Sequence, residues 1–222
     1  MTAVPFVLQL LNSLAALLLL LSFAMLAQRR VVTLVNLLAL QGAILGAATL
    51  LLAWRTGEGN LYVSAALTLA LKVVVLPTLL HRMIRRLGVY WDTDTLINIP
   101  GTMLVGLVVV VFSFGLAQPI TALASTATRS AVGIAVAVIL LALLTMITRR
   151  KAMSQVVGFL SMENGLFFGA MSATYGMPMI VEMGVALDVL VAMLVLGVFF
   201  FQIREQFDTL DLDHLESRDD AP

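Results

Sequence analysis

The chain contains no cysteine. This absence excludes disulfides, zinc held by thiolates, iron–sulfur clusters held by thiolates and catalysis by a thiol. Histidine occurs only as His81 and His214, which lie too far apart in the sequence to suggest a metal site. No Gly-rich nucleotide-binding loop, HExxH motif or GxSxG motif is present. We therefore expect no metal, cofactor or catalytic residue in this chain, so that any enzymatic chemistry would belong to partner subunits.

Charged residues are also scarce. They make up 12% of the 222 residues and the net charge is +0, whereas 61% of the residues are hydrophobic and the mean hydropathy is +1.04. This balance carries no signature of nucleic-acid binding and is typical of a helical membrane protein with several spans. The N-terminus lacks the basic segment of a signal peptide, and its apolar run is longer than a typical signal core. We interpret that run as the first membrane span.

Long apolar runs dominate the rest of the chain. A helix needs roughly 20 apolar residues to cross the hydrocarbon core of a bilayer. Seven runs reach this length, and none alternates like a strand of a membrane barrel. The sequence therefore predicts an all-α integral membrane protein, with one seven-helix transmembrane domain over 1–204 and an acidic cytoplasmic tail over 205–222. The predicted spans are 3–27, 31–54, 60–82, 99–117, 130–149, 153–174 and 178–203.

The Lys and Arg residues of the loops indicate the orientation. Most of them fall on one side of the predicted membrane, and only Arg55 and Arg129 fall on the other. Because cytoplasmic loops carry the excess of positive charge, the N-terminus should lie outside and the C-terminus in the cytoplasm. The residues on the predicted cytoplasmic side are Arg29, Arg30, Arg82, Arg85, Arg86, Arg149, Arg150, Lys151, Arg204 and Arg218.

Two segments on the predicted cytoplasmic side have distinct compositions. In the loop 83–98, Tyr90 and Trp91 are suited to anchor the chain at the membrane interface. The tail 205–222 is acidic and polar, with apolar residues between the acids. It is either a solvated, disordered end or a docking segment for a soluble partner, and the sequence leaves both open.

A few polar residues lie well inside the predicted spans. Lys72, Glu163 and Asp188 occupy the third, sixth and seventh spans, and Gln41 lies near the middle of the second. Glu182 is closer to the outer end of the seventh span. A central charge costs roughly 2.5–3.5 kcal/mol on insertion scales, so such residues normally face protein or water and have a partner. The group is either a structural ion pair that orders the bundle or a relay for protons or ions.

The predicted span 153–174 has two different faces. Small residues recur at steps of three or four and form a stripe that allows close approach of another helix. Glu163 lies about 160–180° from that stripe, at 100° per residue. The span should therefore pack tightly on one side and still need a second surface at Glu163, supplied by this chain or by another subunit. The stripe comprises Ser154, Gly158, Ser161, Gly165, Gly169 and Ser172.

Pro77 follows Lys72 in the third predicted span. Proline lacks an N–H and clashes with the carbonyl four residues earlier, which is that of Val73. We expect a kink beside Lys72 with a freed carbonyl nearby, either as a simple packing bend or as part of a site.

The first three spans and the last three resemble two copies of one unit. When "ALTLALKVVVLPTLL" is aligned with "EMGVALDVLVAMLVL", Lys72 falls opposite Asp188. Gln41 and Glu163 occupy corresponding places in the middle helix of each unit. With the fourth span as a linker, both units would run in the same direction and form a parallel repeat.

Four segments carry a resemblance to a known family. Their order and their positions over the last two-thirds of the chain resemble the hydrogenase-4 component E proteins. These are membrane subunits of group 4 nickel–iron hydrogenase and formate hydrogenlyase complexes. That family is similar in turn to the K-type subunit of respiratory complex I and the C-type subunit of cation/proton antiporters. The segments are LKVVVLP (71–77), GFLSMENG (158–165), VEMGVALD (181–188) and TLDLDHL (209–215).

The resemblance implies roles for particular residues. The small related subunits carry a membrane glutamate followed by asparagine on the second helix, which Glu163 and Asn164 match. The K-type subunit has an acid on its third helix, for which Asp188 or Glu182 qualifies, and Asp188 is preferred for its depth. Gln41 stands where the first unit would have an acid, which favours a single proton route through the last two spans.

The function implied by the resemblance is that of a non-catalytic membrane subunit of a complex I-like oxidoreductase. It would lie in the plasma (inner) membrane of a bacterium or archaeon. Its partners would be antiporter-like membrane subunits, a soluble hydrogenase or formate-oxidising module and membrane lipids. Glu163 would carry the proton, Asp188 and Lys72 would tune it and pass charge laterally, and Gln41 and Asn164 would orient water or side chains. The alternatives are a structural adaptor of such a complex and a stand-alone ion transporter.

Overall fold

The computed structural model describes residues 3–92, 98–121, 126–174 and 183–194, together with the single positions 179, 181 and 197. Within these residues the chain is a bundle of helices without a strand. Six of the helices are long and apolar enough to cross a membrane. The predicted class, an all-α membrane protein, is therefore confirmed.

Most helices follow the predicted spans. The first, second, fourth, fifth and sixth spans correspond to α1 (Ala3–Ala27), α2 (Val31–Thr56), α5 (Ile99–Thr121), α6 (Thr126–Thr148) and α7 (Ala152–Ala173). The third is composite, with α3 (Gly59–Leu69), a π-helical segment (Ala70–Val75) and α4 (Leu76–Leu87).

The seventh predicted span, 178–203, contains the described helix Met183–Leu194. The remainder of that span lies mostly outside the described residues, and so does the whole tail 205–222.

The third membrane helix is longer than predicted. The predicted span ends at residue 82, but α4 continues to Leu87 and stops at Gly88, which has a φ of 65°. The added turn contains Arg85 and Arg86. Arginine is a good helix former, and glycine readily adopts the left-handed conformation that ends a helix, so the helix extends beyond the apolar run.

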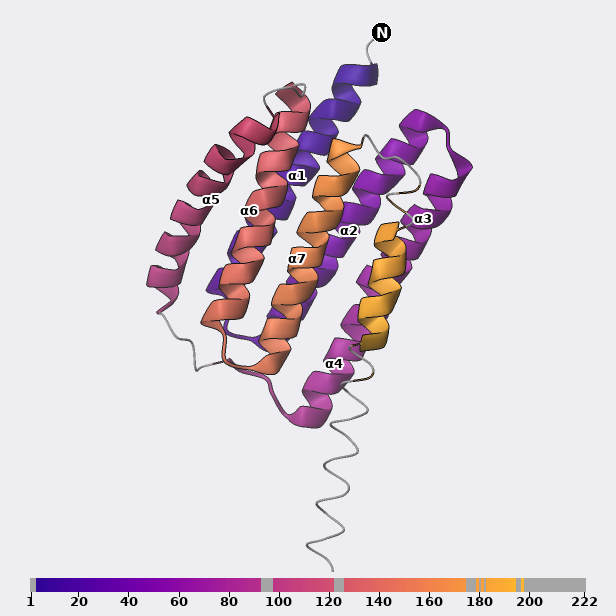
Figure 1. Cartoon of the computed structure of the whole chain (residues 1–222). Coiled ribbons are helices and arrows are strands. Elements are labelled where there is room, and N and C mark those ends of the chain that lie inside the picture. The colour runs from indigo at the N-terminus through magenta and orange to yellow at the C-terminus, as the bar shows by residue number, and fades with distance from the viewer. Residues whose placement is uncertain are drawn as a thin grey trace, which may run out of the picture.

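The helices pack in the order that a parallel repeat predicts. In Figure 1, α1 and α6 run in the same direction, and so do α2 and α7. The first helices of the two proposed units, α1 and α6, pack on each other. The second helices, α2 and α7, also pack on each other. The linker helix α5 lies outside this pairing, against α1 and α6.

Buried apolar side chains form two clusters along the bundle. On α2, one cluster takes residues from 31–38 and the other from 44–53. On α7, the first takes residues from 153–160 and the second from 167–171. The break between the clusters falls at the same level in both helices, and polar side chains fill it.

Candidate functional site: a buried polar layer

The level between the two apolar clusters holds a polar layer, which we define as Ser22, Gln41, Lys72, Glu163, Asn164 and Asp188. Each of these side chains is at most 4% exposed. They come from α1, α2, the π-helical segment, α7 and the helix Met183–Leu194. Gln41 lies ten residues into α2, or roughly 15 Å along a helix that rises 1.5 Å per residue. That depth is about the middle of a bilayer core of roughly 30 Å.

Lys72 holds the two acids of the layer together. Its Nζ lies 2.5 Å from Asp188 Oδ1 and 3.7 Å from Glu163 Oε1. The Glu163 and Asp188 carboxyls therefore both lie within 3.7 Å of one ammonium. Lys72 comes from the third span, Glu163 from the sixth and Asp188 from the seventh, and the three charged residues meet here. This is the partnering expected for charges inside membrane spans.

The charges of this cluster do not balance if every group is ionised. One ammonium faces two carboxylates, which leaves one uncompensated negative charge near the middle of the membrane. An isolated buried charge is costly, and such groups commonly neutralise instead. A single proton on either carboxyl makes the cluster neutral, so the arrangement is chemically suited to bind one proton.

A chain of hydrogen bonds leads from Lys72 across the bundle. Lys72 Nζ donates to Asn164 Oδ1 at 2.8 Å, and Asn164 Nδ2 donates to Gln41 Oε1 at 3.3 Å. Gln41 Nε2 donates to Ser22 Oγ at 2.8 Å, and Ser22 Oγ donates to the Leu18 carbonyl at 2.9 Å. Every link points the same way, because lysine is only a donor and a carbonyl is only an acceptor. The chain fixes the amide orientations and anchors the ammonium.

The backbone around Lys72 departs from regular α-helix. Lys72 lies in the π-helical segment Ala70–Val75, and Pro77 follows this segment near the start of α4. Sequence reasoning expected a kink here, and the structure has a widened turn, in which the Leu76 N–H bonds to the Leu71 carbonyl. Pro77 has no N–H to continue the ordinary pattern. Turns of this kind inside α-helices frequently occur at functional sites.

Gly42 brings α2 against the same segment. A Cβ at this position would lie 2.6 Å from Lys72 Cβ, closer than real side chains approach. Glycine thus allows the two backbones to meet at the polar layer.

The stripe of small residues on α7 packs on α6. A Cβ on Gly158 would meet Met146, one on Gly165 would meet Ile139 and one on Gly169 would meet Ala135. Glu163 faces the other way, toward Lys72 and the helix Met183–Leu194. The second surface that the sequence required at Glu163 is therefore supplied by this chain.

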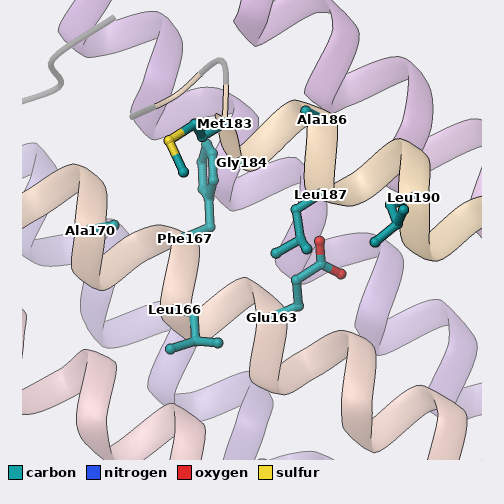
Figure 2. Close-up of a pocket in the computed structure, with 9 residues that line it drawn as sticks. All are labelled: Glu163, Leu166, Phe167, Ala170, Met183, Gly184, Ala186, Leu187 and Leu190. Atoms are coloured by element: carbon teal, nitrogen blue, oxygen red, sulfur yellow. The ribbon is translucent and has the colours of Figure 1, made fainter. Parts of the chain in front are cut away.

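An apolar pocket leads from the surface of the bundle to Glu163. It has a volume of about 520 Å³ and lies between α7 and the helix Met183–Leu194. Figure 2 shows the Glu163 carboxyl directed toward Leu187 and Leu190 across this space. The side chains of Leu166, Met183 and Leu190 at its margin are exposed, so lipid or a neighbouring subunit can reach the opening. The pocket gives the cluster of Lys72, Glu163 and Asp188 a lateral approach within the membrane.

Sequence reasoning missed two features of the polar groups. It did not single out Ser22, whose signal is weak because serine is common in membrane helices. It also treated Arg149 only as an orientation signal. Glu182 and His214, which the sequence brought into consideration, lie outside the described residues.

Arg149 is buried at the end of α6, just outside the span Ser130–Thr148. Its Nη2 donates to the carbonyls of Leu26, at 3.1 Å, and Gln28 at the end of α1. Its Nη1 lies 3.9 Å from Asp92 Oδ2, and Asp92 is fully buried. Burial lowers the pKa of the Arg149 guanidinium, and the Asp92 carboxylate opposes that effect. The residue caps α1 and ties it to the segment after α4, which is a structural role.

Comparison with known proteins gives two levels of similarity. The chain is 40% identical over 187 residues to a Mycobacterium tuberculosis protein described as uncharacterized protein Rv0085, covering 83% of this chain and 85% of that protein. It is 29% identical over 113 residues to hydrogenase-4 component E of Escherichia coli K12 and of Shigella flexneri.

The second similarity covers 51% of this chain and 52% of those proteins, which makes it a distant one. It supports in part the resemblance that the sequence segments indicated. No protein-family model and no solved structure matches the chain. From the first similarity we conclude that the chain belongs to the same family as Rv0085 of Mycobacterium tuberculosis.

Proposed function

We propose that the protein is a membrane subunit of a complex I-like, group 4 hydrogenase-related respiratory complex. In this complex it contributes to the movement of protons, or of sodium ions, coupled to redox chemistry in partner subunits. The observation that carries the proposal is the buried cluster of one lysine and two carboxyls, Lys72, Glu163 and Asp188. The distant similarity to hydrogenase-4 component E supports the kind of complex.

Glu163 is the proton carrier in this proposal. With Lys72 closer to Asp188 than to Glu163, the ammonium compensates the Asp188 carboxylate and Glu163 holds the proton. If the ammonium moves toward Glu163, the charge preference reverses and the proton is released or passed to Asp188. Lys72 thus acts as the switch, and a partner subunit that shifts the π-helical segment would drive it.

The amides of the polar layer serve this switch. Asn164 accepts a hydrogen bond from the Lys72 ammonium, and Gln41 and Ser22 hold the Asn164 amide in that orientation. Asn164 therefore sets a defined resting position for Lys72 between the two acids.

The partners in this proposal are antiporter-like membrane subunits and a soluble hydrogenase or formate-oxidising module, in a bacterial or archaeal plasma membrane. This chain holds no cofactor of its own in the proposal. The apolar pocket at Glu163 is the face through which a neighbouring subunit would approach the cluster.

The test is proton movement by the intact complex with Glu163→Gln, measured per electron transferred after reconstitution into vesicles. We expect assembly and electron transfer to persist while proton movement falls at least severalfold, because glutamine keeps the shape and cannot carry a proton. Glu58→Gln is the matched control, since Glu58 is exposed between α2 and α3. Unchanged proton movement in an assembled Glu163→Gln complex would overturn the relay role.

A structural adaptor is the second candidate. The observation that favours it is the hydrogen-bond chain, which links α1, α2, α7 and the π-helical segment through four buried side chains. In that case Glu163→Gln would conserve proton movement, whereas Lys72→Met would prevent assembly.

A further inference from the structure

A second groove lies away from the polar layer, between α2 and α4 on the predicted cytoplasmic side. It has a volume of about 650 Å³. We define this headgroup groove by the residues that carry the argument, Asn36, Ala39, Val73, His81, Arg85 and Tyr90. None of the described lining residues is an acid.

The groove changes character along its length. Arg85, Tyr90 and His81 line one end, and Val73 and Ala39 line the other. Arg85 and Val73 are twelve residues apart on one helical stretch, or roughly 18 Å at 1.5 Å per residue. A single leaflet contributes about half of a hydrocarbon core of roughly 30 Å. The groove therefore extends from the membrane interface through most of one leaflet.

The interfacial end is built by several contacts. The Val31 N–H donates to the Tyr90 carbonyl at 3.1 Å, which fixes the segment after α4 against the start of α2. Beside it, the Arg30 guanidinium lies 4.6 Å from the centre of the Trp91 ring. Aromatic and basic residues of this kind mark the level of lipid headgroups.

Asn36 is an exposed polar residue on the membrane part of α2. Within the described part of the chain its amide has no hydrogen-bond partner. It lies five residues below the start of α2, or roughly 8 Å at the helical rise, where hydrocarbon alone would leave it unsatisfied. A lipid drawn into the groove would bring an ester carbonyl to this amide as a hydrogen-bond acceptor.

We propose that the headgroup groove is a specific site for a phospholipid with an anionic headgroup. The phosphate contacts Arg85 and Tyr90, an ester carbonyl is drawn down to the Asn36 amide, and an acyl chain lies along Ala39 and Val73. A free inorganic anion would fill only the basic end, and a soluble protein would not reach the apolar end. The basic end and the apolar end of the groove together match the headgroup and the acyl chain of one lipid.

The deep end of the groove touches the segment that holds Lys72. Val73 follows Lys72 in the π-helical segment, and Pro77 also lines the groove. A bound acyl chain thus packs directly on the backbone that positions the lysine of the polar layer. Lipid binding itself does not depend on the proposed function.

The experiment is native mass spectrometry of the full chain in mild detergent, titrated with phosphatidylglycerol or with phosphatidylcholine. We expect phosphatidylglycerol to bind at least tenfold more tightly, and Arg85→Gln to lose that preference. Arg82→Gln is the matched control, because Arg82 is exposed one turn away on the same helix and does not line the groove. The proposal would be overturned if Arg82→Gln lost the preference for phosphatidylglycerol as fully as Arg85→Gln. Equal binding of the two lipids by the unchanged protein would also overturn it.

A second variant tests the apolar half without altering charge. Ala39→Phe narrows the deep end, and we expect it to weaken phosphatidylglycerol binding severalfold while the melting temperature stays within a few degrees. Unaltered binding would contradict the placement of the acyl chain. Displacement of the lipid by millimolar inorganic phosphate would show a simple anion site and would also overturn the proposal.

Discussion

At the scale of single residues, Lys72 determines the chemistry of the buried layer. Its ammonium donates to Asn164 and pairs with Asp188 and Glu163 in a space from which water is largely excluded. Buried ion pairs are weak evidence for stability, but removing one member leaves an uncompensated charge. The layer should therefore respond very differently to single and to paired substitutions.

The first prediction concerns Lys72→Met. Without the ammonium, both carboxyls must take protons or remain as buried anions, so we expect a loss of stability of about 3–5 kcal/mol. Adding Asp188→Asn removes one acid and should recover a large part of that loss. Thermal unfolding of the purified chain in detergent measures both variants. Additive effects of the two substitutions would show that the ion pair is not formed.

The second prediction concerns Asn164→Leu. This change removes the amide acceptor of Lys72, which keeps its two carboxyl partners, and leaves the buried Gln41 Oε1 without a donor. We expect a loss of stability of about 1–3 kcal/mol for the unsatisfied group. Asn98→Leu is the control, because Asn98 is exposed before α5. Thermal unfolding in detergent should show a clear loss of stability for Asn164→Leu and little change for Asn98→Leu. Equal stability of the two would contradict the hydrogen-bond chain.

Much of the candidate site was predictable from the sequence, because charge within a membrane span requires a partner. Lys72, Glu163 and Asp188 stood out for that reason, and the structure brings them together. Ser22 and Arg149 did not stand out, since serine is common in membrane helices and basic residues at helix ends are explained by orientation alone. Their partners depend on which helices become neighbours.

At the scale of elements, the π-helical segment and Gly42 determine where Lys72 lies. A proline was visible in the sequence, but the π-helical turn was not, because it depends on how the freed carbonyls find new partners. The third helix is also longer than predicted. Its predicted end was the end of the apolar run, whereas in the structure the helix ends at Gly88.

The third prediction concerns Gly42→Ala. The added Cβ would lie 2.6 Å from Lys72 Cβ, so α2 and the π-helical segment must separate. We expect a loss of about 1–3 kcal/mol from overpacking, measured by thermal unfolding. Gly115→Ala on α5 is the control, because a Cβ there meets no atom within 4 Å. It should be neutral or stabilise by about 0.5–1 kcal/mol, as helix propensity predicts.

At the scale of the whole molecule, two apolar clusters enclose the polar layer and a buried guanidinium closes one end of the bundle. Arg149 joins the end of α1 to Asp92 and so connects both halves of the chain. Among the described residues, six long apolar helices and the common direction of the two units (Figure 1) were predictable from apolar length and internal similarity. The contacts of Arg149 were not predictable, because they form only after those helices pack.

The fourth prediction concerns Arg149→Gln. The variant loses its donors to the end of α1 and leaves Asp92 buried without a cation, so we expect a loss of about 3–5 kcal/mol. Arg150→Gln, at an exposed neighbour, should change stability by less than about 0.5 kcal/mol. Thermal unfolding and protease resistance would measure the stability of both variants. Equal stability of the two would contradict the structural role of Arg149.

The most direct test of the central claim is to detect the proton that the layer is expected to hold. Infrared difference spectroscopy of the protein in lipid, near neutral pH, distinguishes a protonated carboxyl from a carboxylate. We expect one buried protonated carboxyl signal that disappears in Glu163→Gln/Asp188→Asn and persists in Glu58→Gln. A spectrum in which both acids are ionised, with no such signal, would contradict the claim that Glu163, Asp188 and Lys72 share one proton.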